Sequence, residues 1–316
     1  QPLGTQGNLF GITGGEGTGK SNYVAAIVAG CICPAGAEVD TLGIQITANG
    51  RHKAVLLYDT EQSEVQLFKN VSNLLARAKQ PDKPDELKAF CLTGMSRKER
   101  LNAIVQSMDK FYYQYGGIQL VVIDGIADLV KSANDEAESV AVIDELYRLA
   151  GIYNTCILCV LHFVPNGLKL RGHLGSELQR KAATILSIEK DEEPTQSVVK
   201  ALKVRDGSPL DVPLMLFAWD KEAGMHVYKG EKPREEKEKR KERELVNVAH
   251  DIFGRQTRIT YIDLCEQLQQ VLDIKERTAK SYIRFMRERD IITKDTTNQS
   301  YFVIGSYNLQ RNTSCP

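Results

Sequence analysis

The sequence predicts an α/β fold, in which a mostly parallel sheet is flanked by helices, with a small second domain at the C-terminal end. Short apolar runs alternate with helical patterns up to about residue 160, which is typical of a parallel sheet covered on both faces. Strand-like runs then follow one another without helices between them, which predicts an antiparallel extension of the sheet. A densely charged run near residue 230 separates the two domains.

The bulk composition indicates a folded chain without net charge. Its 316 residues exceed what one core usually needs, so two domains are expected. Lys plus Arg and Asp plus Glu are 41 each, so any surface that binds nucleic acid must be local. Neither a membrane-spanning apolar run nor a signal-peptide pattern is found, so we expect a cytoplasmic protein without membrane contact. Because the first residue is Gln1, we expect that an N-terminal segment has been removed.

The first domain is expected over residues 1–228. Its parallel strands are predicted from apolar runs at 8–13, 53–58, 86–92, 118–123 and 155–161. Its helices are predicted at 20–33, 96–115 and 135–150, and its antiparallel strands at 183–190, 197–204 and 212–218. The helix at 96–115 has the clearest signal, because apolar residues recur at helical spacing between a capping box of Ser96 with Glu99 and a stop at Gly116.

A glycine-rich loop between the first predicted strand and helix carries the strongest functional signal. It has the spacing G-x-x-x-x-G-K-[ST] and consists of Gly14, Gly15, Glu16, Gly17, Thr18, Gly19, Lys20 and Ser21. Glycines let backbone N–H groups turn inward around phosphates, and the following helix N-terminus adds partial positive charge. In this pattern the lysine contacts the β and γ phosphates and the hydroxyl binds Mg²⁺. The sequence therefore predicts that ATP and Mg²⁺ bind at this loop.

Two other predicted strands end in acidic residues, at the edge of the sheet where the loop lies. The strand at 118–123 is followed by Asp124, whose carboxylate we expect to hold Mg²⁺. The strand at 53–58 is followed by Asp59 and Glu61. We expect Glu61 to activate the water that attacks the γ-phosphate. The alternative is that both acids are solvated groups after a strand.

Three more residues are candidates for a role in hydrolysis. His162 follows the fifth strand and is expected to bond the γ-phosphate or to relay its presence to the next loop, unless it makes an ordinary polar contact. Lys203 and Arg205 are two apart on a predicted strand, so their side chains point the same way. We expect them to reach a nucleotide bound by a neighbouring subunit; the alternative is a solvent-facing basic pair near a turn.

These motifs, over residues 8–228, resemble the RecA-like core of recombinases and hexameric helicases. The run Tyr58-Asp59-Thr60-Glu61 is similar to the recombinase strand that ends in a catalytic glutamate. Within that superfamily the chain looks most like the RepA-like plasmid helicases, in which a Leu-Gly element precedes the glutamate strand, as Leu42-Gly43 does here. A histidine at the end of the fifth strand and a later Arg-Gly, here Arg171-Gly172, are further shared features.

The resemblance implies an ATP-hydrolysing motor that acts on DNA and assembles into a ring or filament. Lys203 and Arg205 look like the Lys-x-Arg pair of ring helicases, whose arginine acts on the neighbouring subunit's nucleotide. The loop at 163–175 is expected to face single-stranded DNA through Lys169 and Arg171, because it follows His162, which is placed to sense the γ-phosphate.

The charged run predicts a boundary. Residues 229–244 hold 14 charged residues out of 16 and have no apolar face, so they read as a solvated helix or linker. Residues 245–306 resemble a winged helix, with helices expected at 245–253, 261–272 and 275–289 and a two-stranded wing beyond them, and residues 307–316 form a tail. Its third predicted helix carries a basic stripe of Arg277, Lys280, Arg284 and Arg287. Such a stripe suits phosphate contacts with duplex DNA; the alternatives are a solvated face or a protein-binding surface.

The seven cysteines indicate buried thiols rather than a metal site. Cys156 and Cys159 are three apart in a predicted strand, so they point to opposite faces of the sheet. No second pair or histidine stands at the spacing of a zinc site.

Three functions fit these observations. The first is a ring-helicase-type ATPase in the replication or transfer of a plasmid or other mobile element. The second is a recombinase-like or clock-like ATP switch that assembles on DNA or protein without unwinding it. The third is a regulator in which the C-terminal domain binds an operator and the ATPase controls assembly. ATP-dependent strand separation distinguishes the first from the others.

Overall fold

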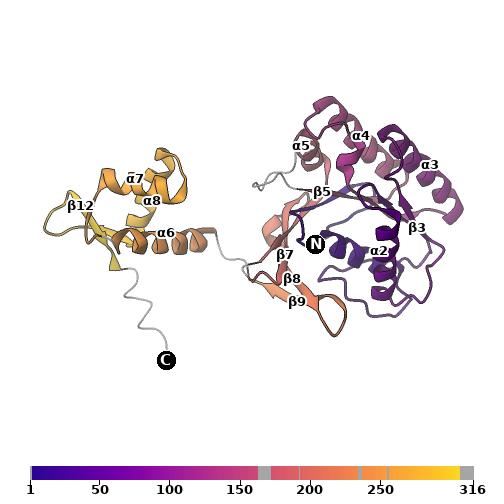
Figure 1. Cartoon of the computed structure of the whole chain (residues 1–316), viewed down its shortest axis with the longest axis horizontal. Coiled ribbons are helices and arrows are strands. Elements are labelled where there is room, and N and C mark those ends of the chain that lie inside the picture. The colour runs from indigo at the N-terminus through magenta and orange to yellow at the C-terminus, as the bar shows by residue number, and fades with distance from the viewer. Residues whose placement is uncertain (1, 163–171, 192, 234–236, 255, 307–316) are drawn as a thin grey trace. The chain divides into compact units, whose positions relative to one another are not determined.

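The computed structural model describes residues 2–162, 172–191, 193–233, 237–254 and 256–306, and these form two compact units that divide at residue 234 (Figure 1). Each unit has its own hydrophobic core. The first unit contains the glycine-rich loop, and the second contains the helix with the basic stripe.

The first unit is built on one large sheet. Its strands are β1 Leu9–Gly14, β2 Ala54–Asp59, β3 Leu87–Cys91, β4 Ile118–Asp124, β5 Cys156–His162, β6 Thr184–Lys190, β7 Gln196–Val204, β8 Leu214–Asp220 and β9 Met225–Lys232. Within the described residues their order is β3-β2-β4-β5-β1-β6-β7-β8-β9. Neighbours from β3 to β6 are parallel, and neighbours from β6 to β9 are antiparallel. The predicted α/β fold with a mostly parallel sheet is confirmed.

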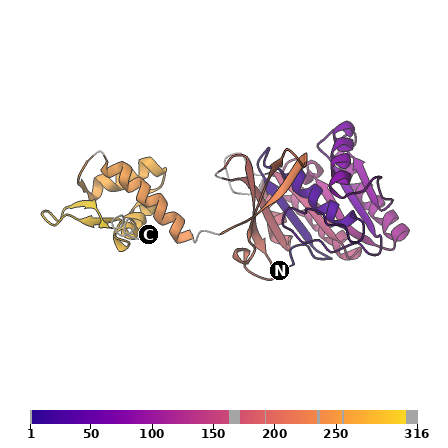
Figure 2. The same ribbon diagram turned by 90° about the horizontal axis from the view of Figure 1, so that it is seen from below.

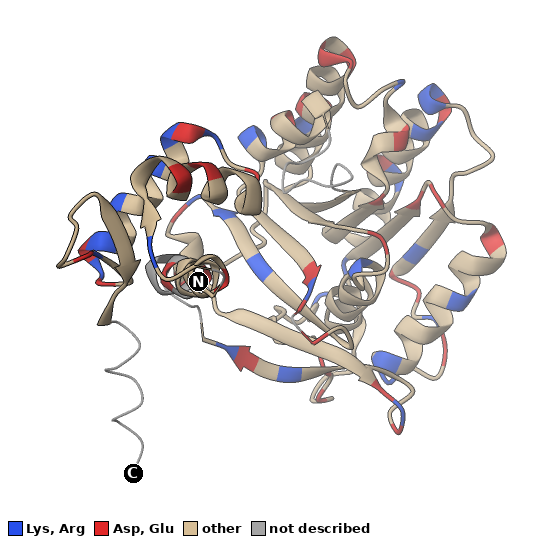
Figure 3. Cartoon of the chain, turned by 60° about the vertical axis from the view of Figure 1, so that its left-hand side comes forward, with Lys and Arg blue, Asp and Glu red and all other residues tan. Residues whose placement is uncertain are grey.

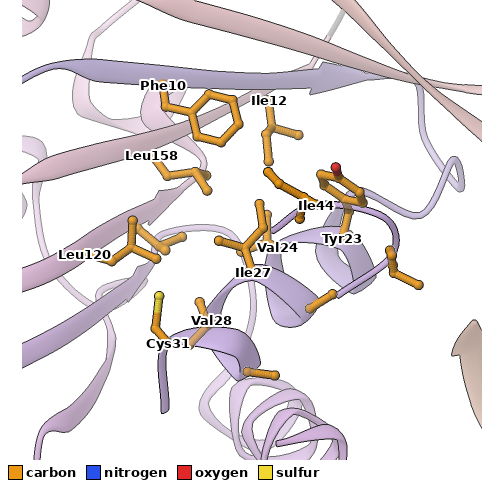
Figure 4. Close-up of a cluster of buried hydrophobic side chains, with 14 of the residues drawn as sticks. Phe10, Ile12, Tyr23, Val24, Ile27, Val28, Cys31, Ile44, Leu120 and Leu158 are labelled. Carbon is orange, nitrogen blue, oxygen red and sulfur yellow. The ribbon is translucent and has the colours of Figure 1, made fainter. Parts of the chain in front are cut away.

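Helices cover both faces of this sheet, and a separate core lies on each face. One core is formed with α1 Lys20–Ile32 and α2 Glu64–Arg77, and the other with α3 Arg97–Tyr115, α4 Glu136–Ile152 and α5 Gly172–Lys181. Figure 4 shows side chains of α1, such as Ile27, pointing toward Ile12 of β1 and Leu158 of β5. Because the central strands are buried on both faces, their sequences read as nearly continuous apolar runs.

The cysteines of β5 show how the two cores divide. Cys156 lies in the core with α1 and Cys31, whereas Cys159 lies in the core of the opposite face, so the predicted orientations are confirmed. Both thiols are free, and burial raises the pKa of each above its usual range. Among the described residues, no group of three or more His, Cys, Asp and Glu side chains is arranged to hold a metal ion. None of the helices in this described part is long and apolar enough to cross a membrane.

Among the α-helices and strands described in the first unit, α2 and β9 are absent from the sequence prediction. α2 begins after Ser63, whose hydroxyl accepts a hydrogen bond from the backbone N–H of Gln66. Leu67, Val71, Leu74 and Leu75 recur at helical spacing and pack on the core, so the sequence carries a signal for this helix that the prediction did not use. β9 lies at the edge of the sheet and has a half-exposed, mixed sequence, MHVYKGEK, which lacks the alternation of an ordinary surface strand.

The charged run at 229–244 was expected to be a solvated helix or a linker, and its described residues belong to a strand and a helix. β9 continues to Lys232, and the helix α6 spans Lys237–Phe253, so both elements extend into this run. Ion pairs explain how the strand tolerates its charges: Lys229 Nζ lies 3.2 Å from Asp220 and Lys232 Nζ lies 2.9 Å from Asp191. The structure therefore moves the end of the first unit from the expected residue 228 to beyond Lys232.

The described residues of the second unit form three helices and a small sheet (Figure 2). Its elements are α6, β10 Ile259–Thr260, α7 Tyr261–Leu272, α8 Glu276–Glu288, β11 Ile292–Lys294 and β12 Tyr301–Ile304. The described strands pair antiparallel in the order β10-β12-β11. Leu245, Leu264, Ile283 and Phe302 belong to its core. The sequence predicts two of these strands; β10 has two residues, too few to leave a pattern. The tail at 307–316 lies outside the described residues.

Candidate functional site

The glycine-rich loop connects β1, which lies between β5 and β6, to the N-terminus of α1. Two of its glycines are required by close packing. A Cβ atom at Gly14 would lie 2.3 Å from the carbonyl oxygen of Ile188, and one at Gly19 would lie 2.8 Å from the ring of Phe217. Gly19 also has a left-handed backbone, with φ of 93°. The loop is therefore a backbone surface pressed against the sheet, with the start of α1 at its end.

Lys20 fixes a positive charge inside this loop. Its side chain is buried, and Nζ donates hydrogen bonds to the backbone oxygens of Gly14 at 3.1 Å and Gly15 at 2.5 Å. Burial lowers the pKa of Lys20, while the nearby Asp124, Glu61 and Glu16 act in the opposite direction. Together with the N–H groups that open α1, this ammonium makes the loop a site for an anion.

The ends of β2 and β4 are held together in register. Asp59 at the end of β2 is opposite Asp124 at the end of β4. Asp59 is buried, and its Oδ1 accepts hydrogen bonds from the backbone N–H groups of Glu61 at 3.0 Å and Gln62 at 2.8 Å. Thr60 donates its hydroxyl to the backbone oxygens of Asp124 and Gly125. Asp59 and Thr60 thus shape the turn, and Glu61 is the acid that this turn presents.

A cleft of about 310 Å³ brings most of the sequence-predicted residues together. It is lined by Glu16, Gly17, Gly19, Lys20, Ser21, Asn22, Glu61, Gln62, Asp124, His162 and His226. Within it, His162 Nε2 lies 3.4 Å from Glu61 Oε2, so the histidine at the end of β5 contacts the acid after β2. Asp59 is not among the residues that line the cleft. The structure therefore separates the two acids that follow β2, and it places Glu61 beside the phosphate loop.

The carboxyl group of Asp124 is strongly perturbed by its surroundings. Burial, followed by the charges of Asp59 and Glu61, raises the pKa of Asp124 to about 7, although His162 and Lys20 act in the opposite direction. Burial also raises the pKa of Asp59, against its two backbone hydrogen bonds. A cation at this position would favour the ionised form of Asp124. The Ser21 hydroxyl and the Asp124 carboxylate line the same cleft and are hard oxygen ligands of the kind that Mg²⁺ takes, so the residues fit this ion.

Lys203 and Arg205 lie at the end of the strands that is opposite to the phosphate loop. The phosphate-loop end of β1 is opposite Ile188, near the end of β6, whereas Val204 is opposite Thr184, at the start of β6. Lys203 Nζ donates to the backbone oxygens of Gln179 and Arg180, and Arg205 Nη2 donates to that of Lys181. Both side chains therefore point the same way, as expected, and they cap the C-terminal end of α5.

Of the residues expected to contact DNA, the structure describes those on α8. Lys169 and Arg171 lie outside the described residues. On α8, acidic and basic residues are interspersed along the sequence ERTAKSYIRFMRE, and Figure 3 shows acidic and basic positions mixed along the ribbon of both units. Lys280 pairs with Glu276 at 2.6 Å and Arg284 with Glu288 at 2.8 Å, and the Arg287 guanidinium lies 5.9 Å from the centre of the Phe302 ring. Arg277, the fourth residue of the stripe, is exposed. Much of the charge of the stripe is thus balanced within the helix.

His226 is a residue of the cleft that the sequence prediction misses. It lies near the start of β9, more than 60 residues after His162, in an element that was itself not predicted. The available signal is the spacing of aromatic side chains, Phe217-x-Trp219 and His226-x-Tyr228, which places alternate residues of a hairpin on one face. Burial lowers the pKa of His226, and Arg77 and Lys190 lower it further, so the neutral imidazole is favoured.

We expect Asp124→Asn to stabilise the nucleotide-free protein above neutral pH. Because the pKa of Asp124 is raised from 3.8 to about 7 on folding, the folded protein holds this proton more tightly than the unfolded chain. The free energy of unfolding therefore falls as the pH rises through this window, and the amide avoids a loss of roughly 2–4 kcal/mol. Thermal unfolding at several pH values measures the difference. Asp82→Asn, at an exposed aspartate that does not line the cleft, is the control; a pH-independent effect of Asp124→Asn would contradict the assignment.

Comparison with protein families agrees with this geometry. A family model described as an AAA domain matches residues 3–166, which is 164 of the 316 residues. The matched segment contains the phosphate loop, the ends of β2 and β4, and His162 at the end of β5. Comparison with curated proteins finds no match. With the phosphate loop, the buried carboxylate and more than half of the chain matched, the protein belongs to the AAA domain family of P-loop ATPases.

Proposed function

We propose that this P-loop ATPase is a DNA-acting motor of the RepA-like helicase type, which serves the replication or transfer of a plasmid or other mobile element. The observation that carries the proposal is the position of Lys203 and Arg205 at the sheet edge opposite the phosphate loop. They cap α5, the helix that follows the segment with Lys169 and Arg171, the residues expected to contact DNA. Residues of this kind can serve a neighbour's nucleotide in a ring or filament.

The cleft supports hydrolysis by the usual division of roles. Lys20 and the loop N–H groups would hold the β and γ phosphates, and Ser21 and Asp124 would hold Mg²⁺. The ion neutralises charge on the phosphates when it is bound. Glu61 is the base that orients and deprotonates water, since its side chain lines the cleft together with Lys20, Ser21 and Asp124. His162 contacts Glu61 and begins the segment that leads to Lys169 and Arg171, so it can relay the nucleotide state.

A second function is an ATP switch that assembles on DNA or protein without unwinding. The ion pairs on α8 favour it, because they reduce the positive charge that the second unit offers to duplex DNA. A winged-helix-like unit whose basic residues are paired in this way is also suited to a protein partner. Strand separation distinguishes this switch from the motor.

We expect the protein to hydrolyse ATP with Mg²⁺ and to be stimulated by single-stranded DNA. Lys20→Ala should abolish nucleotide binding or turnover, because it removes the ammonium that the loop encloses. Phosphate release with and without DNA, followed by unwinding of a forked duplex, is the measurement. Turnover with no response to DNA and no unwinding would favour the switch, and unchanged turnover in Lys20→Ala would remove the assigned site.

We expect Glu61→Gln to bind ATP but to lose hydrolysis by about 10²–10⁴-fold, as for a lost general base. Asp59→Asn is the matched control. Its Oδ1 can still accept the two backbone hydrogen bonds, so the turn is kept while one buried charge is removed. Its turnover should therefore fall less than that of Glu61→Gln. If Asp59→Asn is the more damaging change, the roles of the two acids are reversed.

Arg205→Ala should bind ATP normally and turn over poorly, because an arginine supplied by a neighbour is worth ~10³–10⁵ in rate in well-studied cases. Turnover of the wild type should rise with protein concentration as subunits assemble. Mixing Arg205→Ala with Lys20→Ala should restore part of the activity, since each supplies what the other lacks. If Arg205 serves only to cap α5, the variant will lose thermal stability and mixing will restore nothing.

A further inference from the structure

Four aromatic side chains share one face of the β8–β9 hairpin. In the antiparallel pairing, Phe217 is opposite Tyr228 and Trp219 is opposite His226. Directly opposite residues point to the same face, as do residues two apart on one strand. The Phe217 ring stacks 6.0 Å from Tyr23 of α1 and abuts Gly19 of the phosphate loop. The aromatic row therefore lies on the face of the sheet that carries α1.

The aromatic row extends from the buried core to the end of the strands where the phosphate loop lies. β8 is antiparallel to β7, and β7 is antiparallel to β6, so β8 runs in the same direction as β1. Trp219, next to the end of β8, and His226, next to the start of β9, are therefore at the sheet edge where the loop lies. Phe217 is fully buried, whereas Trp219 is 55% exposed.

His226 joins this row to the nucleotide cleft. It lines the same cleft as Gly17, Gly19 and Lys20, and its ring lies edge-on at 5.5 Å from Trp219 and 5.7 Å from Phe217. Its Nδ1 is buried without a hydrogen-bond partner among the described residues. With the neutral imidazole found above, the ring acts as a flat aromatic surface more than as a charged or hydrogen-bonding group.

We propose that His226 and Trp219 form the wall that binds the base of the nucleotide whose phosphates lie in the loop. This inference rests on the proposed ATP site and adds the subsite that recognises the nucleoside. When the loop holds the phosphates of a nucleotide, the ribose and base extend beyond the loop. The base must then lie along one side of the cleft. On the β9 side it meets an exposed indole and a neutral imidazole, and aromatic faces of this kind stack with bases.

The opposite side of the cleft is less suited to a base. Glu61, Gln62, Asp124 and His162 line it, and its two carboxylates suit Mg²⁺ better than the electron-rich face of a base. These residues also have the partners that hydrolysis requires, such as the contact between His162 and Glu61. The division leaves the aromatic side for the base and the acidic side for Mg²⁺ and water.

The single tryptophan of the chain makes the proposal directly testable. MgATP should change the fluorescence of Trp219 with the same saturation curve that calorimetry gives for binding, whereas Mg-tripolyphosphate, which has no base, should bind the loop and leave the fluorescence unchanged. A change of equal size with both ligands would show that the tryptophan senses the phosphates, and it would overturn the base wall. ATP binding with no change in fluorescence would overturn it too.

Variants separate the wall from the phosphate site. His226→Ala should weaken ATP binding by about tenfold, as expected for the loss of one stacking surface, and should leave tripolyphosphate binding within about twofold. His226→Phe, which keeps a flat ring, should bind ATP nearly as the wild type does. Tyr113→Ala, which removes an aromatic side chain that is 76% exposed on α3, is the control and should change neither.

Different results would contradict the base wall and the proposed ATP site. If Lys20→Ala loses both ligands and His226→Ala binds ATP as tightly as the wild type, the nucleotide site stands and the base wall is wrong. The base wall is also wrong if His226→Phe is as weak as His226→Ala. If the wild type binds neither ATP nor tripolyphosphate, the proposed function fails and the base wall fails with it.

Discussion

The burial of Asp124 beside two other acids, opposed in part by His162 and Lys20, is the constraint on which the site depends. Parallel pairing of β2 with β4 puts Asp59 opposite Asp124, and the turn after β2 adds Glu61. Burial and the two neighbouring charges raise the pKa of Asp124, and the attraction of His162 and Lys20 offsets this in part. The sheet thus holds acids in a place where their ionised forms are costly, which is a common property of sites that bind a cation and a polyanion together.

The rest of the first unit maintains this arrangement. Two residues fix the turn that carries Glu61. Asp59 accepts hydrogen bonds from backbone N–H groups of the turn, and the Thr60 hydroxyl donates to the backbone oxygen of Asp124 at the end of β4. The loop that carries Lys20 is fixed by close packing, since a side chain at Gly14 or Gly19 would collide with β6 or β8. A shift of one residue in the pairing of β2 with β4 would turn these side chains to the other face and disperse the cluster.

The sequence predicts the parts of the fold whose residues carry local signals. Strands buried on both faces are visible as apolar runs, and α3 is visible because its capping box and its Gly116 stop are present as expected: the backbone N–H of Ser96 donates to Glu99, and Gly116 has φ of 65°. The loop residues and Asp124 follow from spacing alone. His226 could not be predicted in the same way, because its place in the cleft depends on β8 and β9 joining the sheet beyond β6 and β7, and no local pattern encodes a contact between residues about 200 positions apart.

Long-range contacts also tie the aromatic side of the cleft to the acidic side. α2 begins after Ser63, two residues beyond Glu61, and ends at Arg77, whose guanidinium donates to the backbone oxygens of Asp40 and His226.

The Asp40 carboxylate in turn accepts the backbone N–H groups of Leu42 and Tyr228, and Gly43 packs so closely against Tyr228 that a Cβ atom there would lie 2.6 Å from its ring. The Leu-Gly element therefore has a physical role in this protein, which is to hold β9 beside α2. Because Arg77 is buried, these hydrogen bonds are shielded from water, and the removal of either partner would leave an unpaired buried group. One helix thus joins the turn that presents Glu61 to the strand that presents His226, so the two sides of the cleft keep a fixed separation while α2 is folded.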